Sequence, residues 1–434
     1  MDVSPPRTSS DAAGTKPALV WLIIGLFFIW GGATSLNDIL IPKLKGLFDL
    51  SFAEAMLTQF AFFMAYFFVS IPAGTLVARL GYLRGLVAGL VVMAGGALLF
   101  WPAANSGVYW PLLVALFVLA GGITILQVAA NPLIAGLGSP ATASSRLTFA
   151  QAFNALGTTV WPFIGAQLLL GTAASIDPAT VPREQLPALR AEEGAIIGNI
   201  YVAIAVVLLI IAAIFWAQRR AVRTERPDEY GFRDSFRLLR RPRVLFGVIG
   251  IFTYVGAEVS IGSVLVSYLE QPTVLGVDAR TAGELIAFYW GGAMIGRFIG
   301  SWLLQKVQAG VLLAVFAGVA ALLVLTSMAT TGTISGWALI AVGLFNSIMF
   351  PTIFSLGLEG LGAKTPEGSG LLCMAIVGGA ILPVLTGTVA DASTIGMALI
   401  VPVICYGIIV AFGLSARRAV VYEDAPMAAP VSPK

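Results

Sequence analysis

Two acidic residues in apolar surroundings are the first candidates for chemistry in this 434-residue chain. Asp38 follows Asn37 toward the end of one apolar stretch, and Glu258 lies near the middle of another. A carboxyl group held away from bulk water can bind and release a proton, whereas a carboxylate among oxygen ligands can hold a sodium ion. Both chemistries stay open, as do a membrane-interface position for Asp38 and a packing role for Glu258.

Side-chain amides form a second set of candidates. An amide both donates and accepts hydrogen bonds, which suits the hydroxyls of a neutral polyol, and the rings of Tyr289 and Trp290 could face the C–H side of a sugar. Hydrogen bonding between helices is an equally good explanation for each amide alone. Together they predict a polar cavity. The amides are Asn37, Gln59, Gln127, Asn131, Gln151, Asn154 and Asn346.

These residues must be positioned by membrane-spanning helices. The chain is 58% apolar and 11% charged, whereas a soluble domain is about a quarter charged. Twelve apolar blocks are each about as long as the roughly 20 residues that cross a bilayer as a helix. We therefore predict an all-α integral membrane protein with twelve transmembrane helices. The blocks are 18–41, 52–77, 82–104, 108–135, 147–173, 195–217, 244–268, 282–304, 311–329, 334–358, 368–389 and 393–415.

The composition excludes several classes of function. The chain has no histidine, and its two cysteines, Cys373 and Cys405, lie singly inside apolar blocks. A histidine-based metal site, a catalytic triad and a thiolate metal centre are therefore not expected. We predict that the chain is not an enzyme and needs no cofactor. The net charge of +3 gives no reason to expect a nucleic-acid partner.

A basic connection divides the twelve spans into six and six. Residues 218–243 carry nine arginines, and they separate a predicted bundle at 18–217 from a second at 244–416. Residues 1–17 and 417–434 are the expected terminal tails. The arginines of the connection are explained by topology and contact with anionic lipid.

The distribution of lysine and arginine predicts the orientation. With the N-terminus in the cytoplasm, only five of the 25 basic residues fall in outer loops, so we expect both termini in the cytoplasm and the chain in the plasma membrane. The five are Lys43, Lys45, Arg183, Arg190 and Arg280.

The two halves repeat short motifs. In each half a Gly-Leu-Gly triplet is followed seven residues later by a serine, a glycine precedes a proline by five residues, and a proline interrupts a span at a matching place. These matches favour a duplicated six-helix unit. The positions are Gly138, Ser145, Gly157, Pro162 and Pro132 in the first half, and Gly362, Ser369, Gly378, Pro383 and Pro351 in the second.

The loop after the second span is rich in glycine and arginine. The segment 73–85 resembles the cytoplasmic signature of the major facilitator superfamily, with Ala78 where an aspartate is usual. Its tight turn requires glycine, and Arg79 and Arg84 could hold an inner gate by pairing with acids or helix C-termini. The positive-inside bias alone would also explain the two arginines.

Six further motifs resemble one branch of that superfamily, the fucose permeases and glucose/galactose transporters, and they extend over nearly the whole chain. The resemblance implies two bundles that rock about a central site and import a monosaccharide together with a cation. The branch's aspartate in the first span corresponds to Asp38. The motifs are Leu36–Leu40, Gln59–Phe63, Gln127–Pro132, Arg146–Asn154, Tyr254–Glu258 and Glu367–Gly370.

One departure bears on the substrate. Fucose permeases carry a glutamate in the fourth span where this chain has Gln127, which argues against fucose and favours glucose, galactose or mannose. Gln127 would then be a ligand of the sugar or, with Asp38, of sodium. We expect a monomeric symporter in the lipid bilayer that uses a proton in preference to sodium. The alternatives are a facilitative uniporter and a proton-driven efflux transporter.

Overall fold

The fold is taken from a computed structural model of the chain, which describes residues 17–48, 52–106, 108–170, 186–220 and 232–417. These residues form helices and turns and contain no strand. Side chains within the described helices are included except at 36–47, 52–53, 55–56, 162–170, 186–193 and 232–234.

Six long helices form the first half. Each corresponds to one predicted apolar block, with ends that differ from the predicted limits by up to nine residues among the described residues. They are α1 Pro17–Phe48, α2 Phe52–Leu80, α3 Tyr82–Asn105, α4 Trp110–Gly136, α5 Ala143–Leu170 and α6 Leu186–Ala217, with the short η1 Pro140–Thr142 before α5.

The second half repeats this arrangement with three interrupted spans. Three spans are single helices, α8 Pro242–Leu269, α9 Ala279–Leu303 and α10 Ala309–Ala329. The tenth span is α11 Gly332–Asn346 with α12 Met349–Leu358, the eleventh is α13 Thr365–Met374, η5 Ala375–Val377 and α14 Gly378–Ala392, and the twelfth is α15 Ile395–Ala398 with α16 Ile400–Ser415. The short elements between them are α7 Phe232–Arg237, η3 Leu238–Arg240 and η4 Gly362–Lys364.

All twelve predicted spans are present as helical segments. Ten of them are long and apolar enough to cross a membrane by length and composition, and the more polar α5 and α9 complete the twelve. The prediction of an all-α membrane protein with twelve transmembrane helices is confirmed.

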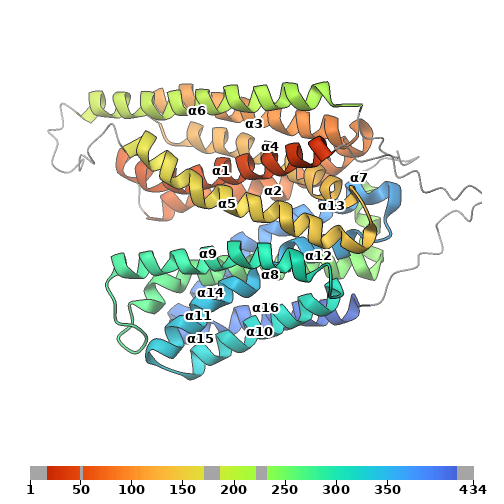
Figure 1. Ribbon diagram of the computed structural model, residues 1–434. Helices are drawn as coiled ribbons and strands as arrows, with labels where there is room; N and C mark the ends of the chain where they lie inside the picture. Colours follow the sequence, from red (N-terminus) through yellow and green to blue (C-terminus); the bar gives the residue numbers. More distant parts are fainter. Residues whose placement is uncertain (1–16, 49–51, 107, 171–185, 221–231, 418–434) are drawn as a thin grey trace, which may run out of the picture.

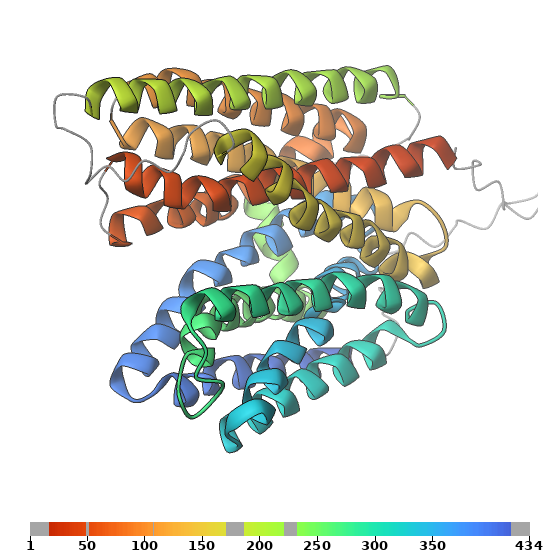
Figure 2. The same cartoon turned by 60° about the vertical axis from the view of Figure 1, so that its left-hand side comes forward.

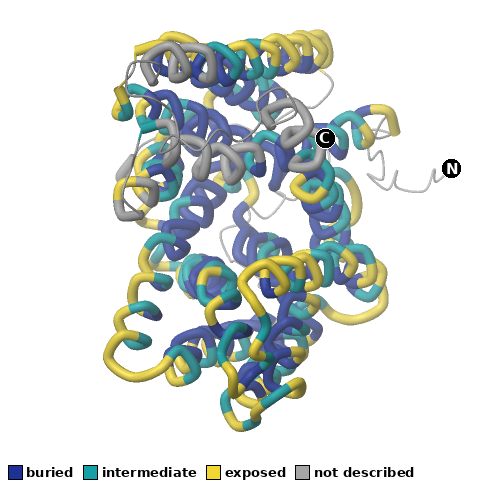
Figure 3. Tube along the Cα trace, turned by 90° about the vertical axis from the view of Figure 1, so that its left-hand side faces the viewer, coloured by how far each residue is buried: buried dark blue, intermediate teal, exposed yellow. Residues whose placement is uncertain are grey.

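The helices form two bundles that lie one above the other (Figures 1 and 2). In the first, α3 packs on α4 and α6 while α1 packs on α5; in the second, α8 packs on α14 and α16 while α10 packs on α16. The buried positions follow the helix faces that point into each bundle (Figure 3).

The bundles contact each other through a few helices. α2 and α4 pack against α13, and α5 packs against α9 and α12. We call the end of the molecule where α2, α4, α6, α9 and α12 finish the linker end, and the opposite end the distal end; the linker end is to the right in Figure 1.

The repeated glycines mark equivalent helix crossings in the two bundles. A Cβ on Gly157 would lie 2.1 Å from the carbonyl oxygen of Phe28 on α1, and a Cβ on Gly378 would lie 2.1 Å from that of Phe252 on α8. No side chain fits at such distances, so glycine is required for α5 to cross α1 and for α14 to cross α8.

The repeated prolines differ in their effect on the helix. α4 continues through Pro132, whereas the tenth span is interrupted at Ser347 and Ile348, just before Pro351. Each proline lacks the N–H that would bond the carbonyl four residues earlier, which leaves the oxygens of Val128 and Ser347 available to other donors. Both oxygens are taken up by side chains from other helices, as described below.

A buried hydroxyl cluster joins three helices at the distal end of the second bundle. The Tyr268 hydroxyl of α8 lies 2.8 Å from Ser335 Oγ of α11 and donates to the carbonyl of Ser327 at 3.0 Å. Ser327 Oγ of α10 in turn donates to the Ser335 carbonyl at 2.9 Å. Since all three residues are buried, these bonds replace water and hold α8, α10 and α11 together.

Replacing Tyr268 with phenylalanine is therefore expected to lower the free energy of unfolding by about 1–2 kcal/mol, because it removes the buried hydrogen bonds of the hydroxyl and leaves Ser327 and Ser335 bonded only to each other within the cluster. The measurement is thermal unfolding in detergent. Ser263→Ala, on the same helix, is the matched control, because Ser263 is exposed and bonds only the Val259 carbonyl of its own helix. Equal unfolding temperatures for the two variants would contradict the assigned role.

Candidate functional site

Three of the predicted amides gather with a tyrosine inside the first bundle. Gln127 and Asn131 lie one turn apart on α4, and Gln151 lies on the neighbouring α5. Gln127 Nε2 donates to the Tyr66 hydroxyl of α2 at 2.8 Å, and Gln151 Nε2 donates to Asn131 Oδ1 at 3.3 Å. The amide cluster, Tyr66, Gln127, Asn131 and Gln151, thus connects three helices.

Two atoms of the amide cluster are buried without a hydrogen bond among the described residues. They are the acceptor Gln127 Oε1 and the donor Asn131 Nδ2. Gln127 is 8% exposed and Asn131 is 0% exposed, so bulk water does not satisfy them. An unpaired acceptor and an unpaired donor on successive turns of one helix match a ligand hydroxyl, which both donates and accepts.

Glu258 lies near the middle of α8, at the depth that its position in the sequence predicts. Its Oε1 is buried without a hydrogen bond to the described part of the chain. The carboxylate interacts electrostatically with the Arg297 guanidinium of α9 and with the Tyr254 hydroxyl one turn earlier on α8. The second bundle therefore places an acid and a base within electrostatic range of each other.

Arg297 is the functional candidate that the sequence analysis missed. Its Nε donates at 3.4 Å to the Ser347 carbonyl, which Pro351 leaves without a helical partner. Its Nη1 donates at 3.3 Å to the carbonyl of Gln151 on α5, in the other bundle. Arg297 thus acts electrostatically on the acid of the second bundle and bonds α5, one of the three helices that carry the amide cluster. The available signal was an arginine well inside a predicted span, where a charged side chain is costly unless it has a partner.

Asn346 and Tyr289 are placed together, apart from the amide cluster. Asn346 Nδ2 donates to the Tyr289 hydroxyl at 2.8 Å, and Asn346 Oδ1 accepts from the Tyr406 hydroxyl at 2.7 Å. All three residues are fully buried, so this network holds α9, α11 and α16 together. Trp290 is 44% exposed and packs its ring edge-on against Tyr289. Sugar binding by Asn346, Tyr289 or Trp290 remains a prediction.

Two other predicted amides lie away from the cluster. Asn154 Nδ2 donates to the Phe27 carbonyl at 3.1 Å and so bonds α5 to α1. Gln59 is half-buried on α2, about two helical turns before Tyr66 and toward the distal end. In this conformation the Asn154 side chain bonds a neighbouring helix. Contact of Asn154 and Gln59 with sugar stays a prediction.

The first-span candidates fall within α1, but the side chains of Asn37 and Asp38 lie outside the described residues. The coupling role of Asp38, and a sodium site shared with Gln127, therefore stay predictions from the sequence.

The arginines predicted to act at a gate flank the turn between α2 and α3. Arg79 is exposed in the last turn of α2, and Arg84 is half-buried in the first turn of α3. Gly81 between them has φ +84°, a conformation that glycine adopts without strain. The glycine-dependent turn is as predicted, and the arginines lie at the linker end; their gating role stays a prediction.

Comparison with known proteins identifies the relatives of this fold. The family model of the Major Facilitator Superfamily matches residues 22–382. The glucose/galactose transporter of Brucella abortus is 51% identical over 395 residues, covering 91% of this chain and 93% of that protein. The L-fucose-proton symporter of Escherichia coli is 35% identical over 404 residues, covering 90% and 91%.

A solved structure shows the same arrangement of helices. The crystal structure of the transporter FucP in the outward conformation has a TM-score of 0.83 and 33% sequence identity, covering 92% of this chain and 98% of that one. These relatives are transporters and not enzymes, as the composition predicts for this chain. The chain belongs to the major facilitator superfamily, in its fucose permease and glucose/galactose transporter branch.

Proposed function

We propose that the chain is a secondary active transporter that imports a monosaccharide, namely glucose, galactose or mannose, in symport with a cation. Its bundles, residues 18–217 and 244–416, would rock about a central site. The linker end and both termini would face the cytoplasm of a plasma membrane, as the distribution of basic residues predicts.

The observation that carries this proposal is the pair of unpaired amide atoms on α4. Gln127 Oε1 and Asn131 Nδ2 offer one acceptor and one donor in a buried setting, where an unmade hydrogen bond costs about 1–3 kcal/mol. The hydroxyls of a sugar can supply both a donor and an acceptor. A hydrophobic drug would leave both unpaired, which disfavours the efflux alternative, and the names of the curated relatives point to sugars as well.

Coupling is assigned to the acid in the other bundle. Glu258 could bind a proton as the cavity opens to the outside and release it to the cytoplasm, and Arg297 supplies the opposing charge beside it. We favour a proton over sodium, since the positive charge of Arg297 acts on this carboxylate and opposes a metal cation there. Sodium held by Asp38 and Gln127 is the alternative.

The direct test is sugar uptake by proteoliposomes under a proton or a sodium gradient applied separately, with radiolabelled glucose and with galactose, mannose and fucose as competitors. Concentrative uptake under one gradient is expected, with weaker competition by fucose. Equilibration without accumulation would indicate a uniporter instead. Absence of hexose flux together with transport of hydrophobic cations would replace the proposal with efflux.

Arg297→Lys is expected to lower the initial rate of uptake by about tenfold or more. A lysine ammonium is a single point of charge and cannot reach both the Ser347 and Gln151 carbonyls as the guanidinium fork does, and each hydrogen bond from a charged group contributes about 1.5–3 kcal/mol. Arg280→Lys is the matched control, because the ion pair of Arg280 with Glu284 lies on the exposed surface. Equal rates for the two variants would remove Arg297 from the mechanism.

A further inference from the structure

The repeated serines of the two halves both bond across the interface between the bundles. Ser145 is the third residue of α5, and Ser369 is the fifth residue of α13. Each follows its Gly-Leu-Gly triplet by seven residues, and each is buried at the linker end, with exposed fractions of 4% and 0%. The repeat therefore places one hydroxyl from each bundle against the other bundle.

Ser145 bonds the end of α9. Its Oγ donates to the Ser301 carbonyl at 2.6 Å and accepts from Gln305 Nε2 at 3.3 Å. In a continuing helix the N–H of Gln305 would bond the Ser301 carbonyl, but that N–H bonds the Trp302 carbonyl instead, because α9 ends at Leu303. A serine of the first bundle thus satisfies a carbonyl that a helix of the second bundle leaves unpaired.

Ser369 does the same in the reverse direction. Its Oγ donates at 2.9 Å to the Val128 carbonyl on α4. This is the oxygen that Pro132 leaves without a helical donor. A serine of the second bundle thus satisfies a carbonyl that a helix of the first bundle leaves unpaired.

The interface around Ser369 is closely packed. A Cβ on Gly370 would lie 2.7 Å from the Ser70 carbonyl oxygen of α2, and a Cβ on Gly74 would lie 2.8 Å from the Pro366 carbonyl oxygen of α13. Backbone contacts backbone here, so water has no room beside the Ser369 bond. The Val128 carbonyl can therefore become exposed to water only after the two bundles have separated at this contact.

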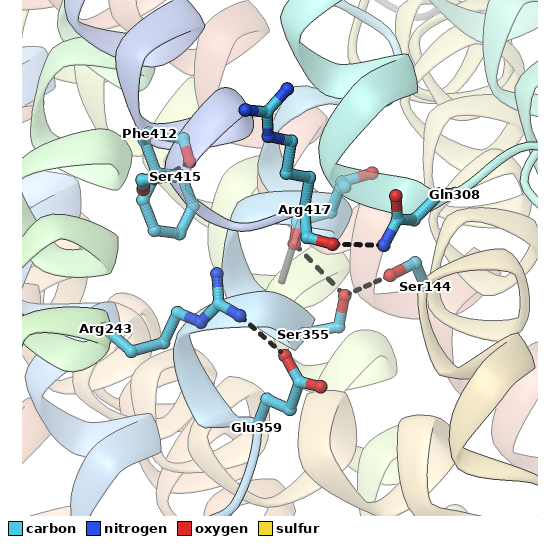
Figure 4. A network of polar contacts seen from close by, with 9 residues as sticks. Ser144, Arg243, Gln308, Ser355, Glu359, Phe412, Ser415 and Arg417 are labelled. Atoms are coloured by element: carbon cyan, nitrogen blue, oxygen red, sulfur yellow. Dashed lines mark hydrogen bonds and ion pairs between the residues drawn. The ribbon is translucent and has the colours of Figure 1, made fainter. Parts of the chain in front are cut away.

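A third contact lies beside these two. Ser144 Oγ of α5 and Ser355 Oγ of α12 are 2.6 Å apart, and the two side chains point toward each other (Figure 4). The ion pair between Arg243 and Glu359, at 3.2 Å, lies within the second bundle in the same view and does not cross the interface.

We propose that Ser145 and Ser369 are the conformation-setting residues of the linker-end gate, each closing it by capping a carbonyl of the opposite bundle. The caps exist only while the gate is shut. Their loss shifts the equilibrium toward conformations open at the linker end. The inference rests on alternating access between the bundles and not on the identity of the sugar.

The test measures the gate directly by pulsed electron spin resonance. Spin labels are attached to the full chain through Ala141→Cys and Lys364→Cys, which are exposed at the linker ends of the two bundles, while Cys373 and Cys405 are buried. Adding Ser145→Ala and Ser369→Ala is expected to raise the ratio of long to short distances about fivefold for each serine, the effect of losing one hydrogen bond of about 1 kcal/mol. An unchanged distribution in the folded double variant would overturn the proposal.

Two further variants test whether a shift in the label distances comes from loss of the bonds between the bundles. Ser327→Ala removes an equally buried serine bond within the second bundle and should leave the label distances unchanged. Pro132→Ala restores an N–H that competes with Ser369 for the Val128 carbonyl, so it should lengthen the distances with Ser369 intact. If the double variant does not fold, each single variant must show its own shift, and no shift in either overturns the proposal. If the label distances shift but the chain transports no hexose, the proposed role of the two serines stands and the proposed substrate is refuted.

Discussion

Replacing Glu258 with glutamine is expected to leave sugar exchange intact but abolish accumulation. Glutamine keeps the shape and the hydrogen-bonding capacity of the side chain but cannot bind or release a proton. A gradient of one pH unit is worth about 1.4 kcal/mol, so coupling one proton to one sugar permits about tenfold accumulation, which Glu258→Gln should reduce to equal concentrations on the two sides. The measurement is the steady-state sugar ratio in proteoliposomes under an imposed pH gradient.

The matched control is Glu284→Gln. Glu284 lies on the exposed face of α9, where it forms a surface ion pair with Arg280, so sugar accumulation by the Glu284→Gln variant should equal that of the unmodified chain. Tenfold accumulation by Glu258→Gln would show that this acid is structural. Asp38→Asn in the same assay decides whether the first-span aspartate, the counterpart implied by the resemblance, carries the coupling instead.

Gly378→Ala is expected to lower the free energy of unfolding by about 3 kcal/mol or more, the largest stability effect we predict. The added methyl would lie 2.1 Å from the Phe252 carbonyl oxygen, and neither partner is a flexible side chain that could move aside. α14 would have to separate from α8 along their crossing. The yield of folded protein and its unfolding temperature in detergent measure the effect.

Gly387→Ala on the same helix is the control, because a Cβ there meets nothing within 4 Å. In an open helical position alanine is more stable than glycine by about 0.5–1 kcal/mol, so this variant should unfold at an equal or higher temperature. Similar losses from both variants would show that helix propensity, and not the crossing, governs the stability of α14.

The membrane-spanning fold follows from the sequence because block length and charge content are properties of each segment alone. Each predicted block became a helical segment, and Glu258 lies near the middle of α8 because its place along a helix follows directly from the sequence. The interruption of the tenth span at Ser347 was less predictable, since Pro132 lies in an uninterrupted helix. Both freed carbonyls accept a side chain from another helix, so the proline and its freed carbonyl do not by themselves determine which helix is interrupted.

The partners of the candidate residues could be predicted only in part. Asn346 and Gln127 have the same character in the sequence, yet Asn346 is satisfied by two tyrosines while Gln127 keeps an unpaired oxygen. Spacing along one helix defines a face but not the helix opposite it. Arg297 escaped the prediction for a similar reason, because its meaning depends on Glu258 and on the Gln151 carbonyl, which other helices supply.

In each cross-bundle bond at the linker end, the donor depends on the type of its side chain and the acceptor does not. Ser145 and Ser369 contribute side chains, but Ser301 and Val128 contribute only main-chain oxygens. Any residue that keeps the helix in place offers the same oxygen. Because Val128 and Ser301 are buried, substitutions of similar size should be tolerated there, whereas loss of the hydroxyl at either donating serine should not.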